Sequence, residues 1–103
     1  MDERPVSAPV YHIQTGDYEW SDWAVYEHPM TPGMRMYFVW TENGCSCSGW
    51  EGPEFKDAEA ATPMTRFQVL KDFSAWWDDR GYDDDPQGKA RRAEKLIAAL
   101  NKR

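Results

Sequence analysis

The chain has 103 residues, which is the length of one ordinary domain, and 15% of them are aromatic, including 6 Trp. No stretch approaches the roughly 18 consecutive apolar residues of a membrane span. Residues 1–5 carry a net negative charge and lead into no apolar run of the kind that a signal peptide has. Dinucleotide, P-loop, zinc-protease and serine-hydrolase motifs are missing from the sequence. We therefore expect a small cytoplasmic protein that is not an enzyme and has no membrane partner.

Charge is distributed unevenly along the chain, whose net charge is -6. Residues 1–88 hold 17 acidic and 6 basic side chains, whereas residues 89–103 hold 6 basic side chains and 1 acidic one. We call residues 1–88 the acidic body. An acidic body followed by a basic C-terminal segment favours a positively charged partner. It disfavours nucleic acid, because the body repels a polyanion.

The first half of the chain predicts an antiparallel sheet after a loose tail over residues 1–8. Residues 10–14 are rich in β-forming side chains, and residues 18–27 alternate with the period of a half-buried strand. A loop with two prolines and a glycine separates them from residues 34–41. Residues 34–41 are apolar on both faces and are therefore expected to form the central strand. The following Glu42-Asn43-Gly44 predicts a tight turn.

The second half of the chain predicts two helices. Thr62 and Pro63 supply a cap and a first position for a helix over 63–80, and a second helix is expected at about 89–101. Their expected apolar stripes are Phe67, Leu70, Phe73, Ser74 and Trp77 in the first helix, and Ala93, Leu96, Ile97 and Leu100 in the second. The expected fold of residues 9–103 is α+β, a small antiparallel sheet of two to four strands packed with two C-terminal helices.

The segment Trp40-Thr41-Glu42-Asn43-Gly44-Cys45-Ser46-Cys47, which follows the aromatic and acidic Tyr18-Glu19-Trp20-Ser21-Asp22-Trp23, resembles a group of small accessory proteins of actinobacteriophages. That group has an aromatic strand, a Gly-Cys-Ser-Cys turn and a following acidic helix. The resemblance covers roughly residues 17–80 and implies a setting rather than an activity. It suggests a non-structural phage protein that acts in the cytoplasm of an actinobacterial host.

Cys45 and Cys47 are the two cysteines of the chain, and His12 and His28 are its two histidines. A closed zinc site needs about four ligands, so a site within one chain would use all four. Cys-x-Cys is also a less usual spacing than Cys-x-x-Cys. The simpler interpretation is a pair of small thiols packed at a strand end, since a strained disulfide is disfavoured in the cytosol. We expect no cofactor, with a zinc-stabilised module as the alternative.

Five aspartates crowd the end of the first expected helix: Asp78, Asp79, Asp83, Asp84 and Asp85. A calcium loop alternates its ligands and places a glycine at its sharp turn, whereas these acids are adjacent and a proline follows them. Catalytic carboxylate pairs need a pocket that raises one pKa, and the sequence indicates none here. The stretch is either a solvated loop or an acidic surface for a basic partner, such as a nucleic-acid-binding protein of the host.

Trp76 and Trp77 are adjacent, so in a helix their side chains point about 100° apart. Both are buried only if the helix is wedged into the fold, which makes one of them a candidate for exposure. Core packing is the favoured role for most of the six tryptophans. An exposed Trp beside acidic groups is, however, the composition of a protein-binding hot spot. Trp50, in a Gly-rich loop, is the other candidate for such a role.

The sequence therefore predicts a non-enzymatic, acidic phage accessory protein that binds and modulates a host cytoplasmic protein. The predicted partner surface consists of Trp50, Trp76, Trp77, Asp78, Asp79, Asp83, Asp84 and Asp85. One alternative is the zinc-stabilised module on Cys45 and Cys47, with His12 and His28 as candidate ligands. The other is a nucleic-acid contact through the basic helix over 89–101, whose Lys and Arg side chains are otherwise expected to form a solvated face.

Overall fold

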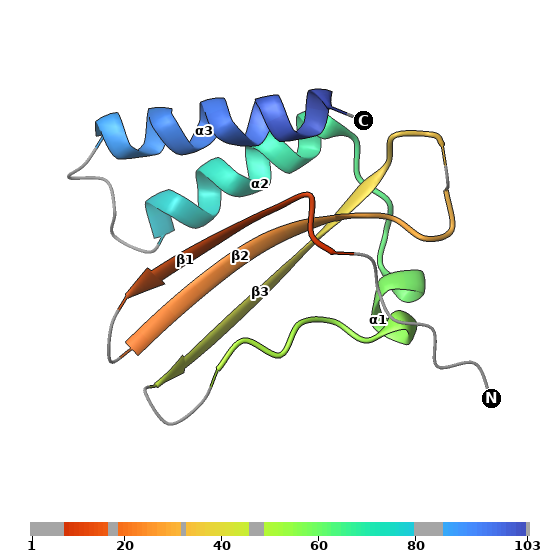
Figure 1. The fold of residues 1–103 in the computed structure, drawn as a ribbon, viewed down its shortest axis with the longest axis horizontal. Helices are drawn as coiled ribbons and strands as arrows, with labels where there is room; N and C mark the ends of the chain where they lie inside the picture. Colours follow the sequence, from red (N-terminus) through yellow and green to blue (C-terminus); the bar gives the residue numbers. More distant parts are fainter. Residues whose placement is uncertain (1–7, 17–18, 32, 46–48, 80–85, 103) are drawn as a thin grey trace.

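The computed structural model describes residues 8–16, 19–31, 33–45, 49–79 and 86–102 and has an α+β fold (Figure 1). The strands are β1 (Tyr11–Gly16), β2 (Glu19–Glu27) and β3 (Tyr37–Cys45), and the helices are α1 (Phe55–Ala60), α2 (Arg66–Asp79) and α3 (Pro86–Asn101). This confirms the expected fold class of a small antiparallel sheet with two C-terminal helices. The short helix α1 was not expected. The loose tail expected over residues 1–8 lies outside the described residues, except for its last position.

The three strands form one antiparallel sheet in the order β1-β2-β3, so the central strand is β2. The expectation that residues 34–41 form the central strand is wrong, because β3 begins only at Tyr37 and pairs on one side with β2. The tight turn expected at Asn43 and Gly44 is also wrong. Both residues lie within β3, where Gly44 pairs with Trp20 of β2. The nine residues of β2 thus find partners along their whole length, and this ladder overrides the weak strand propensity of Asn and Gly.

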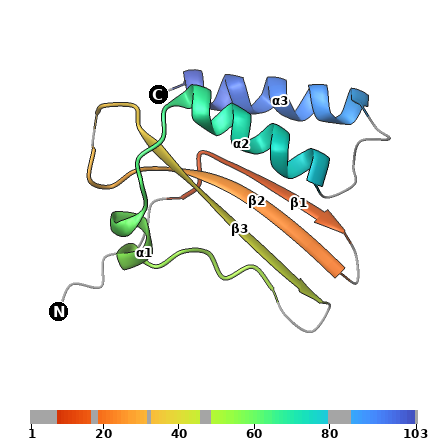
Figure 2. The same ribbon diagram turned by 180° about the vertical axis from the view of Figure 1, so that it is seen from behind.

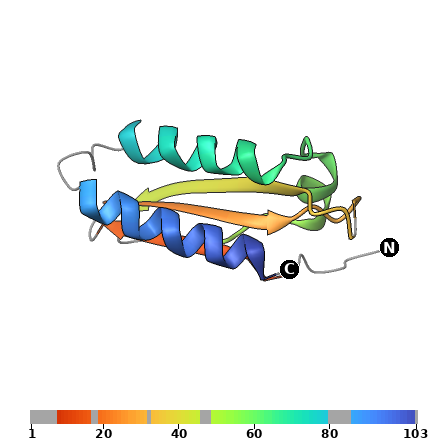
Figure 3. The same cartoon turned by 90° about the horizontal axis from the view of Figure 1, so that it is seen from above.

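Helices α2 and α3 lie side by side on one face of the sheet (Figures 1 to 3). Odd-numbered strand residues point to this face because side chains alternate along a strand. Ile13, Trp23 and Val25 are fully buried there, packed with apolar side chains of both helices. Trp23 lies near the centre of this core: its indole Nε1 donates a hydrogen bond to Asp72 at 2.9 Å, and its ring meets Phe73 edge-on at 5.6 Å. The main core therefore lies between the sheet and the two helices.

Both helices begin at residues other than those predicted. Thr65, not Thr62, caps α2: its hydroxyl accepts a hydrogen bond from the backbone N–H of Gln68, whose side chain accepts one from the Thr65 N–H. This reciprocal pair satisfies two N–H groups that the start of a helix leaves without helical partners. Phe67, expected in the apolar stripe, is 76% exposed. Helix α3 begins at Pro86, where the missing N–H of proline costs nothing.

The opposite face of the sheet is covered in part by α1 and the segment that precedes it (Figure 1). A second, smaller core forms there from Ala24, Tyr26, Phe38 and Ala58, with the rings of Tyr26 and Phe38 stacked at 5.2 Å. Residues 54–61, whose sequence shows only weak periodicity, nevertheless supply α1 because Ala58 is fully buried in this core. No helix within the described residues is long and apolar enough to cross a membrane.

Candidate functional site

Trp76 and Trp77 are both buried, with exposed fractions of 8% and 6%. The prediction that this pair contributes an exposed tryptophan to a partner surface is therefore wrong. Trp76 packs against Trp23 of the sheet at 6.4 Å, and Trp77 packs against Phe73 at 5.9 Å. Helix α2 contacts both the sheet and α3, so two of its faces are buried instead of one. Both tryptophans are core residues.

Trp50 is half-buried and packs on the face of the sheet that α2 and α3 leave open. Its ring lies over that of His12 at 4.4 Å, and its indole hydrogen bonds with the Tyr26 hydroxyl. Burial raises the pKa of Tyr26, the hydrogen bond with Trp50 lowers it in part, and the charge of Glu42 raises it further. Trp50 thus holds its loop against the sheet, which is a structural role beside any contact with a partner.

The acidic stretch that the sequence singled out is described only in part. Asp78 and Asp79 are exposed near the end of α2, and Asp83, Asp84 and Asp85 lie outside the described residues. The Lys89 ammonium of α3 donates to an Asp78 carboxylate oxygen at 2.9 Å. A surface pair of this kind contributes little to stability, but it offsets the charge of Asp78. The acidic partner surface over Asp78–Asp85 stays a prediction.

The four candidate zinc ligands are not brought together among the described residues. His28 is buried; its Nε2 donates to the Ala61 carbonyl at 2.6 Å, and its Nδ1 accepts from the Met30 N–H at 3.1 Å. Cys45 is exposed and disulfide-bonded, rather than a packed thiol, and Cys47 lies outside the described residues. In the described part of the chain, no group of three or more His, Cys, Asp or Glu side chains is arranged to hold a metal ion. Zinc binding stays a prediction.

The basic side chains of α3 have the exposure that is expected of a solvated face. Arg91, Lys95 and Lys102 are exposed, and Lys89 is engaged with Asp78. The apolar stripe predicted for this helix is confirmed by Leu96 and Leu100, which are buried in the main core. A nucleic-acid contact through this face stays a prediction.

A hollow on the open face of the sheet was not predicted from the sequence. It has a volume of about 480 Å³, which lies within the range of about 300–1,000 Å³ that is usual for ligand sites. We call it the acidic pocket, and its described lining residues are Trp20, Trp40, Glu42, Asn43, Gly49, Glu51, Gly52, Glu54 and Asp57. Two indole rings and four carboxyl groups are thus gathered around one cavity, and none of these lining residues is basic.

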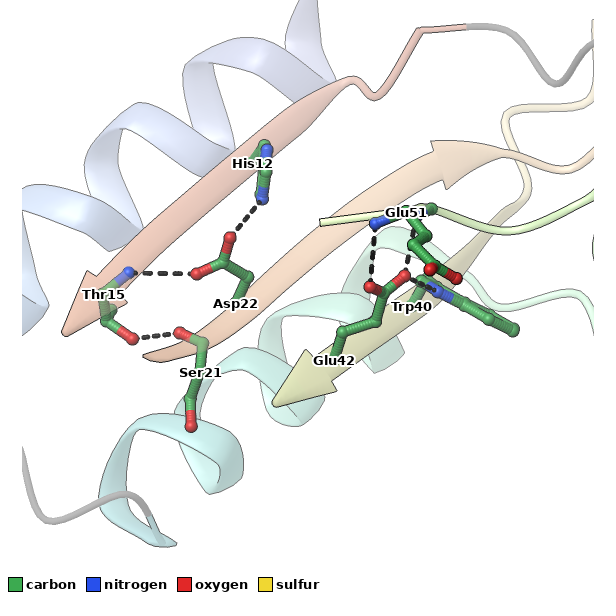
Figure 4. Close-up of polar contacts among 8 residues, drawn as sticks. His12, Thr15, Ser21, Asp22, Trp40, Glu42 and Glu51 are labelled. Atoms are coloured by element: carbon green, nitrogen blue, oxygen red, sulfur yellow. Dashed lines mark hydrogen bonds and ion pairs between the residues drawn. The ribbon is translucent and has the colours of Figure 1, made fainter. Parts of the chain in front are cut away.

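The register between β2 and β3 determines which side chains lie next to each other on this face of the sheet. On β2 and β3, Asp22 lies directly opposite Glu42, and Ala24 lies opposite Trp40. Like charges directly opposite each other on a sheet are destabilising unless other groups compensate them. Asp22, only 4% exposed, is compensated on the β1 side: His12 Nε2 lies 3.2 Å from one of its oxygens, and the Thr15 N–H donates to the other at 3.2 Å (Figure 4).

Glu42 is held in place by three N–H donors (Figure 4). The Trp40 indole and the Gly52 N–H donate to its Oε2 at 2.8 and 2.7 Å, and the Glu51 N–H donates to its Oε1 at 3.0 Å. Burial raises the pKa of Glu42, but these hydrogen bonds and the nearby His12 outweigh that effect, so the pKa lies below its ordinary value. Glu42 is therefore a fixed anion at neutral pH, and it ties the segment around residues 51–52 to the sheet.

The other carboxylates of the pocket come from the segment before α1 and from its first turn. The Asp57 carboxylate accepts a hydrogen bond from the Glu54 N–H at 3.0 Å, as part of a capping box that fixes the start of the helix. Lys56 lies 3.6 Å from a carboxylate oxygen of Glu54, but both side chains are largely exposed. Because such exposed pairs are weak and mobile, Lys56 leaves the pocket with an excess of negative charge. The arrangement suits a cation.

The spacing of aromatic and acidic residues along the strands is a signal for this site in the sequence. Trp20 and Asp22, and likewise Trp40 and Glu42, are two residues apart and so share one face of a strand. The expectation of a turn at Glu42-Asn43-Gly44 concealed that Glu42 belongs to the same face. The pairing of Asp22 with Glu42 depends on the register between β2 and β3, which the sequence alone does not specify.

No family model matches the chain, and neither a curated protein nor a solved structure matches it.

Proposed function

We propose that this protein is a non-enzymatic binding protein whose acidic pocket receives a positively charged segment of another protein. The setting implied by the resemblance makes it a phage accessory protein and its partner a host cytoplasmic protein. The observation that carries the proposal is the lining of the pocket, in which two tryptophans and four carboxylates line one open hollow of about 480 Å³.

Electrostatics support a basic partner. Residues 1–88 hold 17 acidic side chains against 6 basic ones, so the whole body attracts cations. A recess lined by one sign of charge focuses this field and accelerates the association of an oppositely charged ligand. Asp78 and Asp79 lie outside the described lining of this pocket, and Lys89 offsets the charge of Asp78.

Packing supports affinity at the same place. Binding energy at protein interfaces is concentrated in a few residues, and tryptophan is the most enriched type among them. Trp20 and Trp40 are half-buried at the pocket. The Trp20 indole N–H donates to the Cys45 carbonyl at 3.0 Å, and the Trp40 indole N–H donates to the Glu42 carboxylate at 2.8 Å. The indoles are therefore already ordered before a partner arrives, and little conformational entropy is lost when it binds.

Affinity capture from an actinobacterial lysate tests this function. The wild-type protein and the double variant Glu51→Gln/Glu54→Gln are used as baits at about 50 and 300 mM salt, with Glu59→Gln/Glu94→Gln as the control. Glu59 and Glu94 are exposed and do not line the pocket, so this control removes the same charge elsewhere. We expect a protein that is captured by wild type and control, is lost with the pocket variant, and is weakened at high salt. Equal capture by the folded pocket and control variants would contradict the proposal.

A further inference from the structure

We infer that the acidic pocket recognises an arginine side chain of the partner, with the guanidinium packed on the indole face of Trp20 or Trp40 and bound by the carboxylates beside it. This inference rests on the proposed function and specifies the group that the pocket selects. Three features lead to it: the aromatic walls of the pocket, its supply of carboxylate oxygens, and the weak pairing of the Lys56 ammonium with Glu54 at its edge.

The aromatic walls favour a guanidinium over an ammonium. A guanidinium is flat and weakly hydrated, so it stacks on an indole face at a small desolvation cost, whereas an ammonium is compact and strongly hydrated. Cations on tryptophan faces gain about 0.5–2 kcal/mol, which corresponds to about 2- to 30-fold in affinity. Two indoles line this pocket, and because Trp20 pairs with Gly44, four residues along β3 from Trp40, each indole offers its own face to a cation.

The carboxylates divide into a fixed group and an adaptable one. Glu42 already accepts three hydrogen bonds, and Asp57 accepts one from the Glu54 N–H, so these two contribute mainly fixed negative charge. Glu51 and Glu54 are exposed at the edge of the pocket. A guanidinium offers five N–H donors in a planar fork, and it can bind one carboxylate with two parallel hydrogen bonds. Glu51 is the side chain that can turn to meet it, whereas Glu54 takes part in the capping box and adds its charge at the start of α1.

The neighbouring Lys56 does not belong to the described lining of the pocket. Its Nζ lies 3.6 Å from Glu54, and the two side chains are 76% and 72% exposed, so the ammonium of this chain stays in solvent at the edge. Its pairing with Glu54 is a surface interaction of small energy. An incoming arginine that gains both indole contact and a carboxylate fork would therefore displace it.

Fluorescence anisotropy with three labelled peptides tests the inference. The probes are fluorescein-labelled ten-residue peptides that alternate glycine with arginine, with lysine, or with citrulline, which has the shape of arginine without its charge. At about 150 mM salt, we expect the arginine peptide to bind about tenfold more tightly than the lysine peptide. The citrulline peptide should bind more weakly still. Equal affinity for the arginine and lysine peptides, or for the arginine and citrulline peptides, would overturn the inference.

Two single variants and a control locate the binding. Trp20→Leu removes an aromatic face but keeps an apolar side chain, and Glu51→Gln removes one adaptable carboxylate; each should raise the Kd of the arginine peptide about three- to tenfold. Glu59→Gln removes one charge outside the pocket and should leave the Kd within about twofold. Thermal unfolding of each variant establishes that it is folded. An unchanged Kd for both folded pocket variants would overturn the inference.

The failures of the inference and of the proposed function are distinguishable. If a lysate partner is lost with Glu51→Gln/Glu54→Gln while arginine and lysine peptides bind equally, the proposed function stands and the selection of arginine falls. If the arginine peptide binds selectively in the pocket but no partner depends on the pocket in the lysate, the inference stands and the proposed function falls.

Discussion

Glu42→Gln is the substitution that most sharply tests how the pocket is held together. The variant keeps the size of the side chain but removes its charge and turns one oxygen into an N–H donor. The best arrangement of the amide leaves its oxygen at Oε2, where the Trp40 indole and the Gly52 N–H donate at 2.8 and 2.7 Å. The amide nitrogen then faces the Glu51 N–H, which donates to Oε1 at 3.0 Å in the wild type. One hydrogen bond is lost, and two lose their charge assistance.

The expected loss in the free energy of unfolding follows from the free energies of these hydrogen bonds. A hydrogen bond to a charged group contributes about 1.5–3 kcal/mol and one between neutral groups about 0.5–1.5 kcal/mol. Water at this half-buried site replaces part of the loss, so the free energy of unfolding should fall by about 1–3 kcal/mol. For a domain of this size, each kcal/mol lowers the Tm by about 4–8 °C. Urea and thermal unfolding measure both quantities, with Glu59→Gln as the control that should change stability by less than about 0.5 kcal/mol.

The pH dependence of the same comparison gives an independent check. The pKa of Glu42 is lower in the folded protein than in the unfolded chain, so between the two values the unfolded state binds more protons. The stabilisation by Glu42 is complete above the unfolded value of about 4.3 and is lost as the pH falls through the folded pKa. The stability difference between wild type and Glu42→Gln should therefore shrink from pH 7 to pH 3. A variant as stable as the wild type at pH 7, or a difference that does not change with pH, would refute this account of Glu42.

Four further substitutions test the fold around the site by urea unfolding. Leu96→Ala, at a fully buried position between α3 and the rest of the main core, should cost about 2–5 kcal/mol, and a cost below about 1 kcal/mol would contradict the packing of α3. Thr65→Ala should cost about 1 kcal/mol because it removes the cap of α2, whereas Thr62→Ala should cost almost nothing; the reverse order would move the start of the helix back to the predicted position. Phe67→Ser should change stability by less than about 0.5 kcal/mol, since the ring is 76% exposed; a larger loss would place Phe67 in the core.

The order and type of the main elements could be predicted because each depends on local chemistry. Alternation along residues 18–27 predicts β2, and the spacing of Leu96 and Leu100 predicts the buried face of α3. Helix α1 could not be predicted in this way. Its six residues are too few to show a helical period, and what stabilises it is a capping box and the burial of Ala58 against the outer face of the sheet.

The burial of Trp76 and Trp77 depends on tertiary packing, which the pattern of apolar residues in the sequence does not specify. Trp76 and Trp77 point in different directions from α2, and both are buried because the sheet and α3 lie on different sides of that helix. The same indoles on a helix with one buried face would leave one ring exposed. The sequence supplied the two rings, but only the position of α3 decides that neither is available to a partner.

The acidic pocket depends on contacts between distant segments. Glu42 joins the pocket because β3 continues through Asn43 and Gly44, and because the N–H groups of Glu51 and Gly52 turn back onto its carboxylate. The aspartates of the Asp78–Asp85 stretch are conspicuous because they are adjacent in sequence. The carboxylates of the pocket are spread over residues 42–57 and become a site only in three dimensions.

A titration followed by NMR tests the central claim most directly. The protein is labelled so that the indole N–H groups of its tryptophans are observed, and the unlabelled arginine–glycine peptide is added. We predict that the signals of Trp20 and Trp40 shift in a saturable way, while those of the buried Trp23, Trp76 and Trp77 stay in place. Shifts confined to other signals, or no saturable shift at Trp20 and Trp40, would contradict the claim that the open face of the sheet is the binding site.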